Sequence, residues 1–400
     1  MRLLFVFPFC SPEVNSISGG PLYLASAGHA ILIITARHAF SLKGEVSAPE
    51  SAVVDQAEFW RPYAESRDLR ADPFRLWKAV ARKAKQFRPD AVVCFGEFNY
   101  RLAVRLSRHL GVPLIFYMEY LRPEKIAHPI RGKRLLARYA PSLDRLASKV
   151  FLRYLARRAR GIMFAYAGDQ PYVSAVERFG TRVFYVPWCT EVPNFAEPVE
   201  RQRRSGIYIG SLEGFKNAAE LVKAVPLLLD DTPTERFVVV GPGAYAAQVQ
   251  SLADRYGGRL TYIPSVPRAE AMRLLRISGY GFTPVQDCGL GFIGDCWATG
   301  TPLVMTHELD GFVKRGCDTL VADGLEDLPR VVGELLGSDE LSRNCSREGR
   351  LRYEANYTGK AVGERYLEVI RTCLGYTNSI NDGARSPAES MGQKQGDVRC

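Results

Sequence analysis

The alternation of two kinds of segment constrains the fold of this chain more than any other sequence feature. Short apolar runs rich in β-branched and aromatic residues alternate with segments whose apolar residues recur every three or four positions. Such alternation predicts parallel sheets covered by helices, not separate all-α or all-β blocks. The pattern runs twice, and between the two runs residues 190–204 carry two prolines and many charges without apolar periodicity.

The first run predicts strands followed by helices, beginning with the apolar stretch after Met1. The expected helices at 70–87 and 100–110 are followed by Pro89 and Gly111, which are typical helix stops. The expected strands lie at 3–7, 30–35, 91–95, 113–118, 161–166 and 183–187.

The second run repeats this organisation. Strands are expected at 206–209, 237–240, 260–263, 281–284, 302–305 and 319–322, with helices at 218–229, 244–256, 268–276 and 325–336. A chain of 400 residues suits two such domains. We therefore predict an N-terminal domain at 1–189, a linker at 190–204, a C-terminal domain at 205–352, a terminal helix at 353–376 and a disordered tail at 377–400.

Cysteine usage and hydropathy bear on the compartment. The nine cysteines are scattered singly, without a C-x-x-C pair or neighbouring histidines, so the sequence indicates neither a disulfide framework nor a zinc site. No apolar stretch approaches the roughly 18 residues that span a bilayer. The expected location is the cytoplasm, where any membrane contact would be peripheral, on the inner face of the cell membrane.

Positive charge is concentrated in one segment. Residues 122–160 hold twelve Lys or Arg against two acids, which equals the net charge of +10 for the whole chain. Within it, Arg145, Lys149, Arg153 and Arg157 recur every fourth residue, with Leu143, Leu146, Val150 and Tyr154 expected on the opposite side. The segment from Arg131 to Arg160 is therefore either an anionic-membrane contact or a structural helix with a solvated basic face. Nucleic acid is not an expected partner, since exposed aromatics and known modules are missing.

A glycine-rich segment follows one predicted strand of the second domain. It reads DCGLGFIGDCWATGTP from Asp287 to Pro302. Gly289, Gly291 and Gly294 let backbone amides approach phosphate oxygens, and the short helix expected at 292–299 would turn its positive end to the same anion. Leu290 and Phe292 lie between these glycines and are also expected at the donor. Asp287 and Asp295 bracket this loop, and carboxylates suit the hydroxyls of a sugar or a ribose.

Two further loops follow predicted strands. The first runs from Gly210 through Ser211 to Lys216, whose ammonium can serve as a point charge for a diphosphate. The second is the turn with Gly241 and Gly243. Each loop alone is more often structural than functional, but three in order at one sheet edge indicate a phosphate-bearing ligand.

These three loops resemble the donor motifs of retaining GT-B glycosyltransferases. Asp287 and Asp295 fall on the two acids of the family's Glu-x7-Glu motif, residues 300–302 on its closing Gly-x-Pro, and Lys216 on the lysine of G-R-L-x-x-x-K. The resemblance implies two Rossmann-like domains facing across a cleft, with Asp287 on the donor sugar, Asp295 on the ribose and Lys216 on the pyrophosphate. Both acids here are one methylene shorter than in the family, and Ser211 replaces its arginine.

The first domain is expected to face the acceptor. Gly19 and Gly20 lie where the family has a Gly-Gly loop, although an ordinary loop and helix start are as compatible with the sequence. Glu119 stands where many members carry a histidine near the reacting sugar. It can orient or deprotonate an acceptor hydroxyl, or it can form a salt bridge with Arg122.

The expected function is transfer of a hexosyl or related sugar from a nucleotide-sugar to a glycan or lipid-linked acceptor, in polysaccharide or glycolipid synthesis. No D-x-D motif occurs, so we expect no metal and no cofactor; the resemblance implies retention of anomeric configuration. A GT-B-fold sugar-nucleotide epimerase and an inactive nucleotide-sugar-binding protein remain alternatives.

Overall fold

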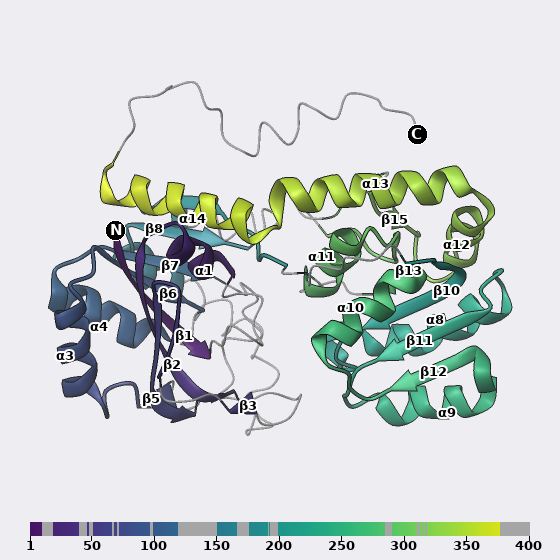
Figure 1. Cartoon of the computed structure of the whole chain (residues 1–400), viewed down its shortest axis with the longest axis horizontal. Coiled ribbons are helices and arrows are strands. Elements are labelled where there is room, and N and C mark those ends of the chain that lie inside the picture. The colour runs from purple at the N-terminus through teal and green to yellow at the C-terminus, as the bar shows by residue number, and fades with distance from the viewer. Residues whose placement is uncertain are drawn as a thin grey trace. The chain divides into compact units, whose positions relative to one another are not determined.

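The computed structural model describes residues 1–9, 19–39, 46–47, 51–65, 68–69, 72–96, 99–118, 150–165, 176–190, 192, 199–284, 290–309, 313, 315–316 and 318–376. The chain forms two compact units, each built on its own sheet (Figure 1). Unit 1 takes the described residues up to Pro187 together with those from Val362 onward, and unit 2 takes Trp188–Ala361.

Unit 1 contains a mixed sheet with the order β4-β5-β2-β1-β6-β7-β8-β9. The short strand β3 pairs with the last two residues of β2. Its ladders are parallel except for β2–β3 and β4–β5. The central strands β6, β7 and β8 are buried along their whole length, as parallel strands covered on both faces must be. The strands are β1 Arg2–Phe9, β2 Ala30–Ala39, β3 Val46–Ser47, β4 Ser51–Val54, β5 Ala57–Glu65, β6 Ala91–Phe95, β7 Leu114–Met118, β8 Gly161–Phe164 and β9 Arg182–Tyr185.

The helices named in the described part of unit 1 are α1 Gly19–Ser26, α3 Trp77–Phe87, α4 Tyr100–Leu110 and the part of α14 (Gly359–Leu374) that belongs to the unit, and residues 150–156 are also helical. Helix α4 ends at Gly111 in the left-handed conformation, as its sequence predicts. Helix α3 begins seven residues later than the expected start at 70, because turns at 73–76 follow Pro73.

Unit 2 contains a fully parallel sheet with the order β12-β11-β10-β13-β14-β15. The strands are β10 Gln202–Ile209, β11 Arg236–Val240, β12 Leu260–Ile263, β13 Ser278–Thr283, β14 Leu303–Met305 and β15 Leu320–Val321. Its helices are α8 Ala218–Asp230, α9 Ala246–Tyr256, α10 Arg268–Ile277, α11 Leu290–Thr299, α12 Leu328–Gly337 and α13 Asp339–Asn356. Strand β10 begins inside the segment that we expected to be linker.

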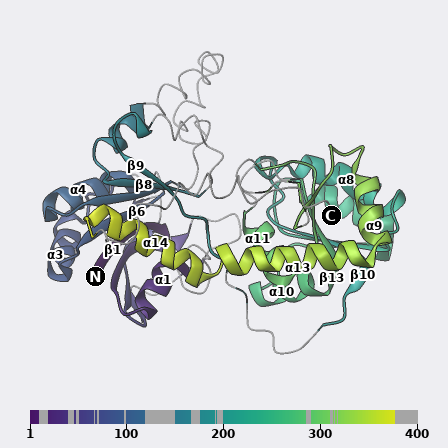
Figure 2. The ribbon, with the colours of Figure 1, turned by 90° about the horizontal axis from the view of Figure 1, so that it is seen from above.

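The last two helices complete different units. Helix α13 packs on α11 in unit 2, with Gly349 facing Trp297, and α14 packs on α1 in unit 1, with Gly363 facing Tyr23 (Figures 1 and 2). The predicted terminal helix therefore corresponds to α14, and α13 precedes it as an additional element. The expected tail at 377–400 lies outside the described residues.

Candidate functional site

The order of the strands in unit 2 places a topological switch point between β10 and β13. From β10, the chain first adds β11 and then β12 on one side. It then returns to the other side of β10 and adds β13, β14 and β15 there. Because all strands are parallel, the loops that follow β10 and β13 leave from the same sheet edge on either side of this point. Ligands of open α/β sheets bind in the crevice that forms there.

The loop after β10 carries the predicted Gly210, Ser211 and Lys216. It ends in a short 3-10 turn, Gly214–Lys216, and Asn217 then adopts the left-handed conformation with φ 57° before α8 begins. The side-chain Nδ2 of Asn217 donates to the carbonyl of Pro284, 3.0 Å away, just after β13. This hydrogen bond joins the two loops that flank the switch point.

The loop after β11 packs directly onto the loop after β10. The Gly210 amide donates to Val240 O at 2.9 Å, and the Leu212 amide donates to Pro242 O at 2.8 Å. Gly241 has φ 143°, and a Cβ on it would lie 1.8 Å from the carbonyl oxygen of Gly210. Gly243, with φ 153°, would place a Cβ 2.4 Å from the Leu212 carbonyl oxygen. Loop packing alone therefore requires glycine at these two positions, whether or not a phosphate approaches them.

The third predicted loop is described only from its helix onward. Asp287 and Gly289 lie outside the described residues, whereas Leu290 and Gly291 open α11. Gly291 is exposed, and no atom of the described residues lies within 4 Å of a Cβ built on it, so these residues leave its backbone open to a ligand. Phe292 is buried, with its ring 5.8 Å from that of Tyr208, which gives this residue a packing role in α11.

Asp295 is also buried, at 6% exposure, and both of its carboxylate oxygens bind Arg268. Arg268 Nη2 lies 2.5 Å from Asp295 Oδ1, and Nη1 binds Oδ2. Burial alone would lower the pKa of Arg268, but the hydrogen bonds and the charge of Asp295 reverse this and raise it. The pair thus holds a charged guanidinium in place at the first residue of α10, which follows β12 at the same sheet edge.

A second polar cluster at this edge was not predicted. Glu220, in the first turn of α8, accepts a hydrogen bond from Thr306 Oγ1 at 2.5 Å, and its other oxygen lies 3.1 Å from His307 Nε2. Asn217 also donates to this carboxylate. Thr306 and His307 directly follow β14, so the rule that identified the other loops also applies to them.

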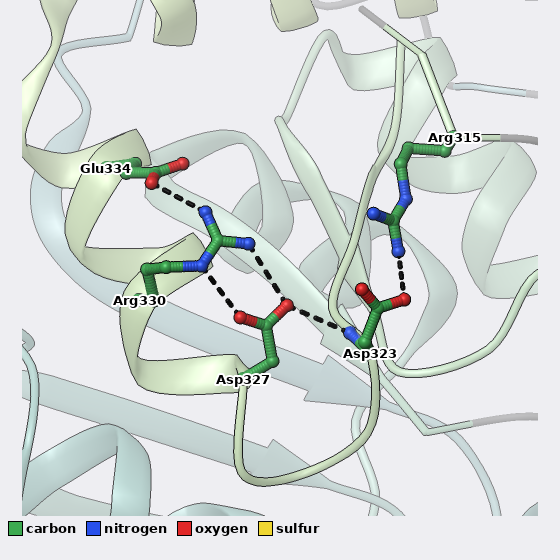
Figure 3. A network of polar contacts seen from close by, with 5 residues as sticks. All are labelled: Arg315, Asp323, Asp327, Arg330 and Glu334. Carbon is green, nitrogen blue, oxygen red and sulfur yellow. Dashed lines mark hydrogen bonds and ion pairs between the residues drawn. The ribbon is translucent and has the colours of Figure 1, made fainter.

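The segment after β15 is occupied by a charge network of its own (Figure 3). Arg330 binds Asp327 with two nitrogens, at 2.7 and 3.1 Å, and Glu334 at 2.6 Å, while Arg315 binds Asp323. The Asp323 amide donates to Asp327, 3.0 Å away. These side chains satisfy one another and fix the entry to α12, so this part of the edge is not a candidate anion site.

Unit 1 holds the predicted acceptor-side residues. Gly19 and Gly20 form the first turn of α1, which is the helix start that the sequence also allowed. A Cβ on Gly20 would lie 2.7 Å from the ring of Tyr366, so packing against α14 accounts for this glycine. Glu119 lies outside the described residues.

The basic segment is described only from Val150 onward. Residues 150–156 are helical, and Arg153 and Arg157 are exposed, as expected. The expected apolar face is wrong in one respect, because Val150 is 61% exposed while Leu152 and Leu155 are buried. The helix therefore buries a different face from the predicted one, and its Leu152 and Leu155 pack in the hydrophobic core of unit 1.

Within the described ranges, no three His, Cys, Asp or Glu side chains are grouped in a way that could hold a metal ion. None of the helices in those ranges has the length and apolar character needed to cross a membrane.

Comparison with known proteins identifies the fold. No family model matches the chain, and a search of curated proteins finds no relative. Solved structures match over nearly the whole chain. The sucrose-phosphate synthase of Thermosynechococcus elongatus has a TM-score of 0.71 at 14% identity, covering 94% of this chain and 99% of its own. An α,α-trehalose-phosphate synthase (UDP-forming) from Burkholderia vietnamiensis has a TM-score of 0.66 at 13% identity, covering 93% and 99%. Anabaena HepE in complex with UDP and glucose has a TM-score of 0.63 at 12% identity, covering 93% and 100%.

At such low identity, these similarities establish the fold class alone. Each unit of this chain has the parallel α/β organisation of a Rossmann-like domain, and the chain as a whole has the GT-B fold of glycosyltransferases.

Proposed function

We propose that this protein transfers a sugar from a nucleotide-sugar donor to a glycan or lipid-linked acceptor, with the donor bound at the switch point of unit 2. The observation that carries the proposal is the Asn217–Pro284 hydrogen bond, which joins the two loops where an open α/β sheet binds its ligand. The GT-B fold supports it, and so do similar structures whose names include UDP-forming synthesis or bound UDP and glucose.

Charge on the leaving diphosphate needs positive partners on the protein. In our proposal Lys216 provides a point charge, and the exposed backbone at Gly291 provides amides at the positive end of α11. Arg268 provides the charge that is missing where Ser211 replaces the arginine of the family motif. Its side chain is 45% exposed although Asp295 binds it with both oxygens.

This arrangement assigns Asp295 a second role beside its predicted contact with the ribose. The carboxylate fixes the guanidinium of Arg268 in one orientation, which lowers the entropy lost when a phosphate binds. Glu220 acts similarly on the opposite side of the switch point, because it holds Asn217 and His307. Asp287 on the donor sugar, Glu119 on the acceptor hydroxyl, retention of configuration and independence of metal remain predictions.

The donor proposal is tested first by thermal shift with UDP-, GDP- and ADP-sugars, followed by release of nucleoside diphosphate on addition of acceptor. A bound donor at 100 times its Kd stabilises the folded protein by about 2.7 kcal/mol. We expect one base to stabilise and its diphosphate to be released only with acceptor. Stabilisation without release under any acceptor would favour a binding protein, and conversion of the sugar without release would favour an epimerase.

Variants of α10 test the role of Arg268. Arg268→Gln is expected to weaken donor binding about 10- to 100-fold, as loss of a charged hydrogen bond does. Arg273→Gln is the matched control, because Arg273 lies on the same helix and binds only the exposed Glu270 in the described part of the chain. Equal affinity in both variants would remove Arg268 from the site.

We also propose that the acceptor side of the protein contacts an anionic membrane. Val150, Arg153 and Arg157 are all exposed, and their spacing places them on one side of the helix. An apolar residue between cations suits a lipid surface, where each near-surface charge contributes about 1 kcal/mol. Reversal of Arg145, Lys149, Arg153 and Arg157 to Glu should abolish sedimentation with anionic vesicles at low salt. Unchanged sedimentation would make this a structural helix with a solvated face.

A further inference from the structure

Unit 2 has a second polar site at the sheet edge opposite the donor loops. A cavity of about 620 Å³ lies where β10 and β13 begin, between these strand ends, the end of α11 and one side of α13. Five arginines and one acid line it, together with serines and glycines. We call it the arginine pocket, and its charged residues are Arg201, Arg203, Arg343, Arg347, Arg350 and Asp339.

Arg201 is partly buried, and its hydrogen-bond partners among the described residues are all neutral. It donates to the carbonyls of Thr299 and Arg276, at 2.9 and 3.3 Å, and to Ser346 Oγ at 2.9 Å. Across the described residues no carboxylate pairs with it. Burial, followed by the nearby charge of Arg276, lowers the pKa of Arg201, so its positive charge is incompletely compensated.

Arg203 adds an unsatisfied donor. Its Nη1 pairs with Asp339, but its Nε is buried and has no hydrogen-bond partner in the described part of the chain. Buried donors of this kind are rare in native proteins, because leaving one without a partner costs about 1–3 kcal/mol. Arg203 also lines the cavity, and its pairing with Asp339 leaves one of its guanidinium donors unsatisfied.

The other three arginines form a row on α13. Arg343, Arg347 and Arg350 are exposed and spaced by four and three residues, which places them on one face of the helix. Arg347 binds Glu348 and Arg350 binds Glu354, whereas Arg343 makes no hydrogen bond or ion pair with any described residue. Like charges at this spacing repel, and the two glutamates each offset one of the three, so Arg343 is the member of the row whose charge no described carboxylate offsets.

We propose that the arginine pocket binds a phosphoryl-bearing anion, at a site separate from that of the sugar donor. Guanidinium groups bind phosphate oxygens with two parallel hydrogen bonds. The lining holds five of them, and no described carboxylate pairs with Arg201 or Arg343. The volume is within the range of small-molecule sites, which is about 300–1,000 Å³. Since the pocket lies at the amino ends of the strands, both sites can be occupied together.

The binding test uses inorganic pyrophosphate, measured by isothermal titration calorimetry. All proteins carry Lys216→Ala, so that the proposed donor site contributes little to the signal. Arg343→Gln with Arg347→Gln should weaken binding at least tenfold. Lys223→Gln with Arg255→Gln removes two exposed cations of α8 and α9 outside the pocket and should change the affinity less than twofold. No binding at millimolar pyrophosphate, or equal loss in both double variants, would overturn the proposal.

Chemical protection makes the test independent of folding of the variants. In the unmodified protein, pyrophosphate should protect Arg343 from phenylglyoxal, as read by peptide mass spectrometry, and should leave Arg255 reactive. Absence of protection would contradict the proposal. Vesicles of phosphatidic acid, compared with phosphatidylcholine, distinguish a lipid headgroup from a soluble phosphate. Loss of vesicle binding in the Arg343→Gln, Arg347→Gln protein identifies the headgroup as the source, and pyrophosphate binding without vesicle binding identifies a soluble anion.

Discussion

Replacement of Gly291 by alanine separates a phosphate-binding role from a packing role in α11. In the part of the chain that the structure describes, nothing lies within 4 Å of a Cβ at this exposed position, and its backbone is already helical. Alanine is favoured over glycine by about 0.8–1.0 kcal/mol inside a helix, and by less in its first turn. We therefore expect about 0.5 kcal/mol of stabilisation without ligand, which raises Tm by about 1–2 °C.

The same methyl group should weaken donor binding. It would occupy the space through which a phosphate oxygen reaches the amides at the start of α11. Loss of one or two charge-assisted hydrogen bonds costs about 1.5–3 kcal/mol each, which is at least a tenfold loss of affinity. Calorimetric titration with the donor identified by thermal shift measures this, beside thermal unfolding without ligand.

Gly333→Ala is the matched control for this experiment. Gly333 lies inside α12, and a Cβ on it also meets nothing within 4 Å. It should stabilise the protein by up to about 1 kcal/mol and leave donor affinity unchanged. A Gly291→Ala protein that is stabilised but binds the donor normally would refute the placement of the diphosphate at α11. A destabilised Gly291→Ala protein would refute the description of the space around this residue.

Three further predictions concern other parts of the chain. Lys216→Ala should weaken binding of the nucleoside diphosphate about 10- to 100-fold in titration calorimetry, and a smaller change would remove this lysine from the site. In urea unfolding, Gly241→Ala should destabilise the protein by at least 2 kcal/mol more than Gly257→Ala. Both positions have positive φ, but of the two only a Cβ at Gly241 would meet backbone atoms of the described residues, so equal losses would contradict this account. Burial raises the pKa of Cys373 to about 11 and, together with the charge of Asp318, that of Cys345 to about 12. Because the unfolded chain loses these thiol protons already near pH 8.5, the free energy of unfolding should fall as the pH rises from about 8.5 toward 11. Replacing both cysteines by alanine should flatten the decline between pH 8.5 and 10.5, and an unchanged slope would contradict the assignment.

The strand pattern made the fold predictable, and its failures have local causes. The hairpin β4–β5 was missed because Pro62 and several charges interrupt its apolar alternation, although one side of β5 is buried. Helix α13 was missed because its sequence is dominated by charges and it buries mainly Cys345, Gly349 and Tyr353. Tertiary contacts with α11, which the sequence does not reveal, stabilise it.

The candidate site was predictable as a set of loops but not as a set of contacts. Glycines after strands indicated the edge, and the structure brings the loops with Gly210 and Gly241 together. The pairing of Asp295 with Arg268 could not be foreseen, because it joins two helices that are separated by β13 along the chain. The sequence shows only that a basic residue, Arg268, begins a helix that follows a strand. Its place in the site follows from its pairing with Asp295, which only the structure shows.

The most direct test of the central claim is a crystal structure of the protein with its nucleoside diphosphate, identified by the thermal-shift screen. Our account predicts the diphosphate at the carboxyl ends of β10 and β13, with oxygens in hydrogen-bond range of Lys216, Arg268 and the first amides of α11. A diphosphate bound elsewhere, including in the arginine pocket alone, would contradict the account.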